Sequence, residues 1–261
     1  MPNCQLKTNF IKADDGFDGS LVTYRYEDDL DSDFIGCRIL LYTFFHFEKN
    51  YDFIAKTNIG ELFYICGIDT KALHYKRRAT YQLLSDCITW FIDNNYISII
   101  NGGSLDDFDY NEMIRIQIIE ENFYPSIKVV DGKEKVDEPF TPITKEEFET
   151  LMTIRNNQLP KIAFTFAYIK SCCVFRLQGQ SIERFPKCAL LTHSQIADHI
   201  GMHRTKMQGL VDIICDAELL RRKQLTRTNA KILPPYIYTP NASGWEKELY
   251  YGKLKYDKKR E

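Results

Sequence analysis

Residues 204–208 bring together side chains that bind phosphate oxygens and the edges of bases. Arg204 and Lys206 supply cations, Thr205 a hydroxyl and Gln208 an amide. Cations and hydroxyls bind the phosphates of nucleic acids, and an amide can also bind a base edge in the major groove of DNA. The chemistry that this run predicts is therefore hydrogen bonding to a polyanion, without a covalent step.

Two short helices are predicted to position this run. Thr192 and Gln195 fit a reciprocal N-terminal cap, and Gly201 fits the end of the first helix. In the second helix, which begins at Arg204, apolar residues recur at i, i+3, i+4 and i+7, so one face is buried and the other is exposed. The apolar residues of this helix are Met207, Leu210, Val211 and Ile214. The exposed face then carries Gly209 together with Thr205, Lys206 and Gln208.

A basic hairpin is predicted after the second helix. Its strands are residues 219–225 and 231–238, and two prolines restrict the return strand to an edge position. The cations within residues 221–227 have no acidic neighbour in the sequence after Glu218, so we expect them to bind an external anion. These cations are Arg221, Arg222, Lys223 and Arg227, and Lys231 flanks the tip on the other side.

The first half of the chain has a similar succession of predicted elements. Its helices and strands are expected at residues 36–50, 58–66, 76–94, 96–100 and 113–119, the last two being strands joined by an acidic loop. A cationic cluster precedes or opens the third helix, and it is either a second phosphate contact or a solvated helix start. This cluster contains Lys71, Lys76, Arg77 and Arg78.

The third predicted helix is apolar on both faces. Leu83 and Trp90 lie seven residues apart, on the side away from its main apolar stripe. An exposed stripe of this kind is unusual on a soluble monomer, so we expect a partner surface there. The second domain is one candidate partner, and we favour the same helix of a second copy in a homodimer.

The segment at residues 192–210 resembles the helix-turn-helix of winged-helix DNA-binding proteins. Their pattern is roughly S/T-x-x-x-I-A-x-x-I/L-G-x-S-R-x-T-V, and this chain has THSQIADHIGMHRTKMQGL. His203 departs from the pattern, because the family usually has a small capping residue at that position. The resemblance is good over residues 144–238 and weaker over residues 36–119. It implies that the second helix enters the major groove and that the basic tip contacts the neighbouring minor groove or backbone.

The fold class that follows is mainly α with small β-hairpins (α+β), with two winged-helix domains in tandem. The expected boundaries are an N-terminal segment with a turn and a possible strand at 1–35, a first domain at 36–120, a linker at 121–143, a DNA-reading domain at 144–240 and a charged C-terminal tail at 241–261. For the tail we favour a frayed or partly ordered end over a helix that packs Trp245, Leu249 and Leu254 on a partner.

Composition narrows the functional classes further. The 261 residues are 44% hydrophobic and carry a formal net charge of -2, which argues against indiscriminate coating of nucleic acid. The eight cysteines form no C-x-x-C pair, and most are expected to be reduced and buried. The N-terminus lacks the pattern of a secretory signal, and the apolar segment 159–177 is interrupted by charges, so we expect a cytoplasmic protein without membrane spans.

Catalytic and cofactor motifs are not recognisable in the sequence. Its glycines do not form a phosphate-binding loop, and Gly201 interrupts the helical spacing that His199 and His203 would need to share a metal ion. We therefore expect neither an enzyme nor a metal ion or cofactor.

Two functions of different classes fit these observations. The first is a sequence-specific double-stranded DNA-binding protein, a transcription regulator or origin binder, since tandem winged helices resemble regulators and replication-initiation proteins of plasmids and phages and the N-terminal domain of DnaD-like proteins. The second is a winged-helix protein-interaction module without DNA reading, which the acidic net charge favours. For the first function the candidate DNA-binding residues are Thr192, His203, Arg204, Thr205, Lys206, Gln208, Arg221, Arg222, Lys223, Arg227 and Lys231, with Lys71, Lys76, Arg77 and Arg78 from the first half.

Overall fold

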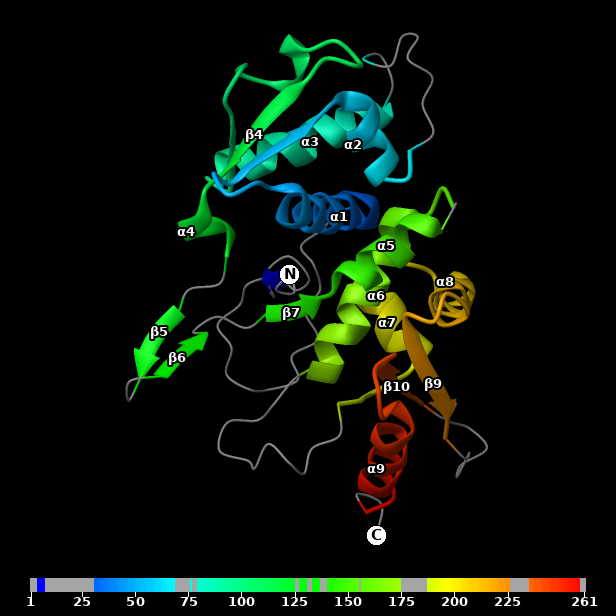
Figure 1. Cartoon of the computed structure of the whole chain (residues 1–261). Helices are drawn as coiled ribbons and strands as arrows, with labels where there is room; N and C mark the ends of the chain where they lie inside the picture. Colours follow the sequence, from blue (N-terminus) through cyan, green and yellow to red (C-terminus); the bar gives the residue numbers. More distant parts are fainter. Residues whose placement is uncertain are drawn as a thin grey trace. The chain divides into compact units, whose positions relative to one another are not determined.

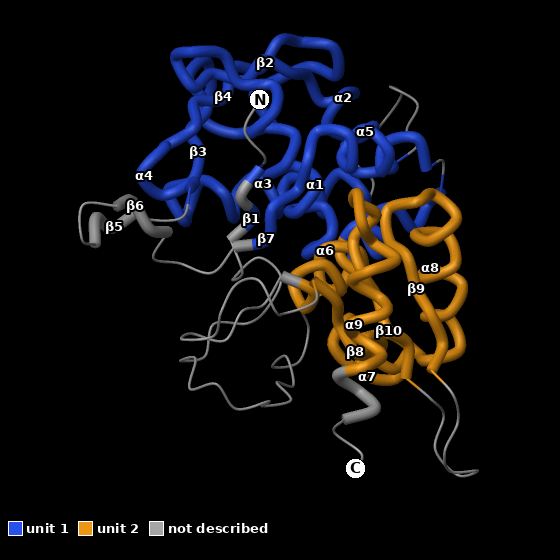
Figure 2. Tube along the Cα trace, turned by 60° about the horizontal axis from the view of Figure 1, so that its bottom comes forward, with its two compact units in different colours: residues 1–10, 33–163 blue, residues 11–32, 164–261 orange. Residues whose placement is uncertain are grey.

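The structure is a computed structural model with a mixed α+β fold, as expected (Figure 1). It describes residues 4–7, 31–68, 76, 79–124, 127–130, 133–136, 140–154, 156–174, 187–225 and 235–258. The chain divides into two compact units, which Figure 2 distinguishes by colour: unit 1 draws on residues 1–10 and 33–163, and unit 2 on residues 11–32 and 164–261. Each unit contains a three-stranded antiparallel sheet.

The first helix of unit 1, α1 (Ser32–Glu48), is buried on all sides. Residues 35–47 are all buried, which explains why the sequence here is apolar without a polar face. The elements are α1 (Ser32–Glu48), β2 (Ile54–Thr57), α2 (Ile59–Ile65), α3 (Ala79–Asp93), β3 (Ile97–Ile99), the 3-10 helix η3 (Leu105–Asp107) and β4 (Ile114–Ile118). Strand β4 is the central strand of the sheet, in the order β2-β4-β3.

The segment expected to be a linker contains regular structure. Its elements are α4 (Glu120–Phe123), β5 (Ile127–Val130), β6 (Lys133–Val136) and β7 (Phe140–Ile143), with β5 paired to β6 and β7 paired to β1 (Cys4–Lys7). Helix α5 (Lys145–Thr153) follows with the expected capping box of Thr144 and Glu147. The Phe148 ring of α5 lies 5.9 Å from that of Phe47. The division between the units therefore falls between residues 163 and 164, later than the expected boundary at 143.

Unit 2 repeats the order of elements found in unit 1. It contains α6 (Leu159–Val174), which crosses the division, then β8 (Ala189–Leu191), α7 (His193–Ile200), α8 (Arg204–Asp216), β9 (Leu220–Gln224), β10 (Tyr236–Pro240) and α9 (Trp245–Lys258). The sheet order is β8-β10-β9, so the last strand again lies in the centre. The expectation that two prolines restrict this strand to an edge is therefore wrong, because β10 begins at Tyr236, after both prolines, and pairs on both sides. Both units thus have the order helix, strand, helix, helix, strand, strand.

The strand before the second helix was missing from the sequence-based order in both units. Strands β2 and β8 have four and three residues. So short a segment shows too little alternation of apolar and polar residues to be recognised, and its pairing partner, β4 or β10, lies far along the chain.

The charged C-terminal segment is helical over residues 245–258 rather than frayed. Leu249 is buried in a cluster with Leu225 and Ile237, and Trp245 packs against the same cluster. Leu254, which the alternative expectation also placed in the packed face, is 39% exposed.

The cysteines are free thiols, and most of them are buried, as expected. All eight cysteines are free, and five of them are buried: Cys4, Cys37, Cys66, Cys87 and Cys173. Within the described residues, no helix is both long and apolar enough to cross a membrane.

Candidate nucleic-acid interface

Helices α7 and α8 are joined by a tight turn at Gly201. The Thr192 side chain accepts a hydrogen bond from the Gln195 amide at 3.2 Å, and the Gln195 side chain accepts one from the Thr192 amide at 2.8 Å, which completes the expected capping box. Gly201 has φ +70°, a left-handed conformation that glycine adopts without strain. The chain therefore reverses within a few residues and α8 starts at Arg204.

His203 takes the capping role that smaller residues fill in the resembling family. It occupies the N-cap of α8, where its Nδ1 accepts from the Thr205 amide at 3.4 Å and lies 2.8 Å from the Thr205 hydroxyl. The imidazole thus replaces the usual small polar cap and fixes the first turn of α8.

Helix α8 has the two faces that its sequence predicts. Its apolar residues are buried: Met207, Leu210, Val211 and Ile214. Its other face is exposed and carries Arg204, Thr205, Lys206, Gln208 and Gly209. A Cβ added to Gly209 would meet nothing within 4 Å, so another molecule can approach the backbone closely there. The structure brings two cations, a hydroxyl and an amide onto one solvent-facing surface.

Two of the hairpin cations have carboxylate partners inside unit 2. Arg222 forms an ion pair with Asp212 of α8, and Arg221 forms one with Glu218 at 2.8 Å. Arg221 also donates to the Asn241 side chain at 3.0 Å. Arg221 and Arg222 therefore do not need the external anion that the sequence led us to expect, because Glu218 and Asp212, which precede them in the sequence, approach them in space.

Of the remaining predicted hairpin cations, only Lys223 lies within the described residues. Lys223 is exposed at the end of β9. Arg227 and Lys231 lie outside the described residues, as does the predicted tip.

Asp212 and Tyr236 belong to the same polar cluster and were not foreseen. The Arg222 guanidinium lies 5.5 Å from the centroid of the Tyr236 ring, and Tyr236 stacks on His193 with centroids 4.7 Å apart. Burial, and next the Arg222 cation, lower the pKa of His193. The cluster connects the first residue of α7 with α8, β9 and β10. An acidic residue on the sheet-facing side of α8 is the only hint of this cluster in the sequence. The hint cannot be used without knowing which residues of the strands lie opposite it.

The histidines of this region act in separate contacts. His193 stacks on Tyr236, His199 stacks on Tyr168 with centroids 3.8 Å apart, and His203 caps α8. Among the described residues, no group of three or more histidine, cysteine, aspartate or glutamate side chains is placed to hold a metal ion.

Helix α3 of unit 1 occupies the same place in the order of elements as α8 but has a different exposed face. That face carries Gln82, Asp86, Thr89 and Asp93, with two carboxylates and no cation. Of the cationic cluster before it, Lys76 is exposed and donates to the Asp106 carbonyl at 2.8 Å. Lys71, Arg77 and Arg78 lie outside the described residues.

The loop between β3 and β4 presents acidic side chains. Leu105 and Phe108 are buried and anchor it, while Asp106, Asp107 and Asp109 are exposed. Hydrogen bonds from the Ser104 and Gly103 amides lower the pKa of Asp107 and so favour its charged form. The loop therefore exposes three carboxylates, whereas strand β9 carries Arg221, Arg222 and Lys223.

The apolar stripe of α3 is partly covered within unit 1. The Arg38 guanidinium lies 3.9 Å from the centroid of the Trp90 ring, and Tyr96 stacks on Trp90 at 5.4 Å. Leu83 is half-buried. Residues of the same unit therefore cover part of the apolar surface that we expected a second copy to cover in a homodimer.

Comparison of the chain with models of protein families, with curated proteins and with solved structures gives no match. Its function is therefore inferred from the residues and their geometry.

Proposed function

We propose that this protein is a sequence-specific double-stranded DNA-binding protein of the winged-helix type. The observation that carries the proposal is the exposed face of α8, where Arg204, Thr205, Lys206 and Gln208 stand beside a glycine that leaves the backbone accessible. A helix with this face inserts into a major groove, where cations and hydroxyls bind phosphates and an amide binds a base edge.

The arrangement around α8 supports the same proposal. In a winged helix a strand precedes the helix-turn-helix and a hairpin follows it, with the last strand in the middle of the sheet; β8-β10-β9 has this order. Unit 1 has it as well, in β2-β4-β3. The proposed architecture is thus two winged helices in tandem, of which the second reads DNA because the exposed face of α3 is acidic.

We further propose that the protein acts in the cytoplasm as a transcription regulator or origin binder, as its resemblance to plasmid and phage regulators and initiators suggests. Selection of bound fragments from a random genomic library, followed by footprinting, tests this role. Fragments from promoters would support regulation, and repeated sites at a replication origin would support initiation.

Duplex binding itself is tested by gel shift with the full chain and its Lys206→Ala and Gln208→Ala variants. Gln82→Ala is the matched control, since Gln82 is an exposed amide at a similar place on α3. We expect duplex binding to be weaker in the two α8 variants than in the wild type and unchanged in the control. Equal binding by all four proteins would exclude α8 as the reading helix.

A winged-helix protein-interaction module is the second candidate function, and unit 1 supplies the observation that favours it. Its α3 face and its β3–β4 loop are acidic, which suits a basic protein partner better than DNA. Failure of the wild type to shift any duplex, together with capture of a defined basic protein that Asp86→Lys abolishes, would favour this function.

Two-fold assembly through Leu83 and Trp90 is the weaker part of the proposal, because Arg38 covers one face of the Trp90 ring. Sedimentation of the wild type and of a Leu83→Glu variant tests it. A wild type that is monomeric both free and on DNA would remove this contact.

A further inference from the structure

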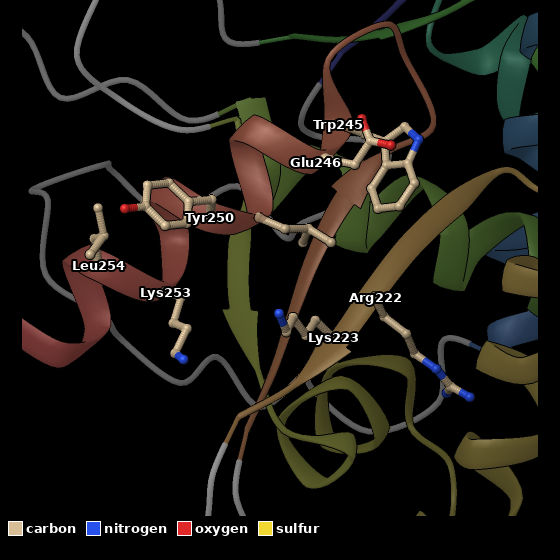
Figure 3. A pocket seen from close by; sticks show the side chains of 8 residues that line it. Arg222, Lys223, Trp245, Glu246, Tyr250, Lys253 and Leu254 are labelled. Carbon is tan, nitrogen blue, oxygen red and sulfur yellow. The ribbon is translucent and has the colours of Figure 1, made fainter.

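A groove runs between strand β9 and helix α9 of unit 2. Its volume is about 540 Å³, within the range of about 300–1,000 Å³ that is typical of ligand sites. Figure 3 shows the side chains of Lys223 and Lys253 extending into the space between the strand and the helix. The lining residues used below are Lys223, Trp245, Glu246, Tyr250, Lys253 and Leu254.

This groove lies on the face of the sheet that is opposite to α8. Successive side chains of a strand point to opposite faces: Lys223 lines the groove, and Arg222, which also borders the groove, has its guanidinium paired with Asp212 of α8. In β10, Tyr236 stacks on His193 of α7, whereas Ile237 packs with Leu249 of α9. A ligand in the groove would therefore not compete for the surface of α8.

The groove combines two exposed cations with one exposed aromatic ring, that of Tyr250. Lys223 and Lys253 are exposed, and neither forms an ion pair with another described residue. Tyr250 is 61% exposed and Leu254 is 39% exposed, although both are large apolar side chains. Glu246 is the single acid among the lining residues.

One wall of the groove is held in place by a contact behind it. The Arg221 guanidinium lies 5.4 Å from the centroid of the Trp245 ring, and Trp245 packs against the cluster of Leu225, Ile237 and Leu249. These contacts hold the start of α9 against the sheet.

We propose that this groove binds single-stranded DNA. Lysines on both walls would hold the phosphate backbone, and the exposed Tyr250 ring would stack on a base that is not paired. A duplex does not fit this chemistry, because its bases are already stacked on one another and its backbone alone would meet the lysines. An acidic protein segment would use the cations but would leave the exposed ring without its preferred planar partner. The proposal goes beyond the duplex binding assigned to α8 and does not depend on it.

The test is fluorescence anisotropy of the full chain with a labelled oligodeoxythymidine of about 12 nucleotides, within the lengths that single-strand-binding grooves cover. We expect Tyr250→Ala to weaken binding by about 5- to 150-fold, the range for removal of one stacked base. Lys223→Glu and Lys253→Glu should weaken it as well, and more strongly at low salt. Tyr250→Phe should bind like the wild type because it keeps the ring.

Matched controls separate the groove from general charge. Lys247→Glu makes the same charge change as Lys253→Glu on the same helix. Tyr251→Ala removes a ring that is 54% exposed and whose centroid lies 5.7 Å from that of Tyr250; neither Lys247 nor Tyr251 lines the groove. Both controls should bind the oligonucleotide like the wild type. Lys206→Ala should weaken duplex binding and leave single-strand binding unchanged. The experiment can therefore reject the duplex site on α8 and the single-strand groove independently of each other.

Three results would overturn the proposal. The first is an equal weakening of binding in Lys247→Glu and Lys253→Glu, which would indicate net charge alone. The second is equal affinity for an abasic oligonucleotide of the same length, which would show that no base stacks on Tyr250. The third is displacement of the oligonucleotide by an equally charged polyglutamate peptide at the same concentration, which would identify the groove as a site for acidic protein segments. Thermal melting of each variant confirms that it is folded.

Discussion

Asp212 and Arg222 form an ion pair that joins helix α8 to strand β9. The two side chains come from the helix proposed to read DNA and from the first strand of the hairpin that follows it. Tyr236 and His193 extend the contact to β10 and α7. The pair therefore holds strand β9 against helix α8. We predict that Arg222 positions the hairpin relative to the exposed face of α8.

Replacing Asp212 with Asn should separate this positioning role from stability. The decrease in unfolding free energy should reach at most about 1 kcal/mol, because the two side chains are 26% and 39% exposed. Binding of cognate duplex should weaken in addition, since re-ordering a freed side chain costs about 0.5–1.5 kcal/mol on association. Denaturant titration and gel shift measure the two effects.

The control for this prediction is Glu218→Gln, which breaks the exposed ion pair of Arg221 without touching α8. Glu218→Gln should lower the unfolding free energy and the affinity for cognate duplex less than Asp212→Asn does. The reciprocal exchange, Asp212→Arg with Arg222→Asp, should recover part of the duplex affinity; a double variant no better than either single one would contradict a role for the pair.

Gly209→Ala should stabilise the free protein. Glycine within a helix is less stable than alanine by about 0.5–1 kcal/mol, and a Cβ at position 209 meets nothing within 4 Å. Gly209→Leu should also fold well but should weaken duplex binding, because the larger side chain projects toward the DNA. Thermal unfolding and gel shift check both substitutions.

Gly252 provides the contrasting case for this prediction. It also lies in a helix, α9, but a Cβ there would come within 2.6 Å of the Cys188 Sγ. Gly252→Ala should therefore destabilise the protein.

If Gly209→Leu binds duplex DNA as tightly as the wild type, the DNA must bind to another surface.

Lys206 and Gln208 should differ in how their removal affects binding. Lys206→Ala should weaken binding to all duplexes alike and reduce the salt slope by about 0.9 for each phosphate that the variant no longer neutralises. Gln208→Ala should cost about 1–3 kcal/mol on the cognate site and less on random sequence. Affinities measured over a range of salt concentrations, on both kinds of DNA, distinguish the two; equal decreases on cognate and random DNA would remove Gln208 from base reading.

His193 should make the protein less stable in mild acid. Its pKa is lowered in the folded state, by burial first and by Arg222 second, so below its ordinary value of 6.5 the unfolded chain binds more protons than the folded one. The free energy of unfolding should therefore fall as the pH drops from 6.5 toward the lowered pKa, and should be unaffected by this group above pH 6.5.

The variant that tests this pH dependence is His193→Phe, which can keep the stacking on Tyr236 but does not titrate. Denaturant titrations at neutral and mildly acidic pH should give a smaller decrease in stability for the variant than for the wild type. Equal decreases in the two proteins would assign the acid sensitivity to other groups.

The sequence alone determined the features of this protein that depend on residues close together in the chain. The capping boxes at Thr144 and Thr192, the turn at Gly201 and the buried and exposed faces of α8 all follow from spacings of a few residues. The hydrogen bonds that close a helix turn join residues three or four apart, so their pattern is visible without any tertiary contact.

Tertiary structure decided the features in which distant residues meet. Strands β2 and β8 exist because β4 and β10 pair with them. The partners of Arg222 and Trp90 are Asp212 and Arg38, which come from other elements of their units. Helix α9 packs Leu249 and Trp245 against Leu225 and Ile237, and these two partners could not be identified from the sequence of the helix. Charge and apolar surface in a sequence show that a residue needs a partner, but only the packing of strands and helices determines whether that partner belongs to the same unit or to another molecule.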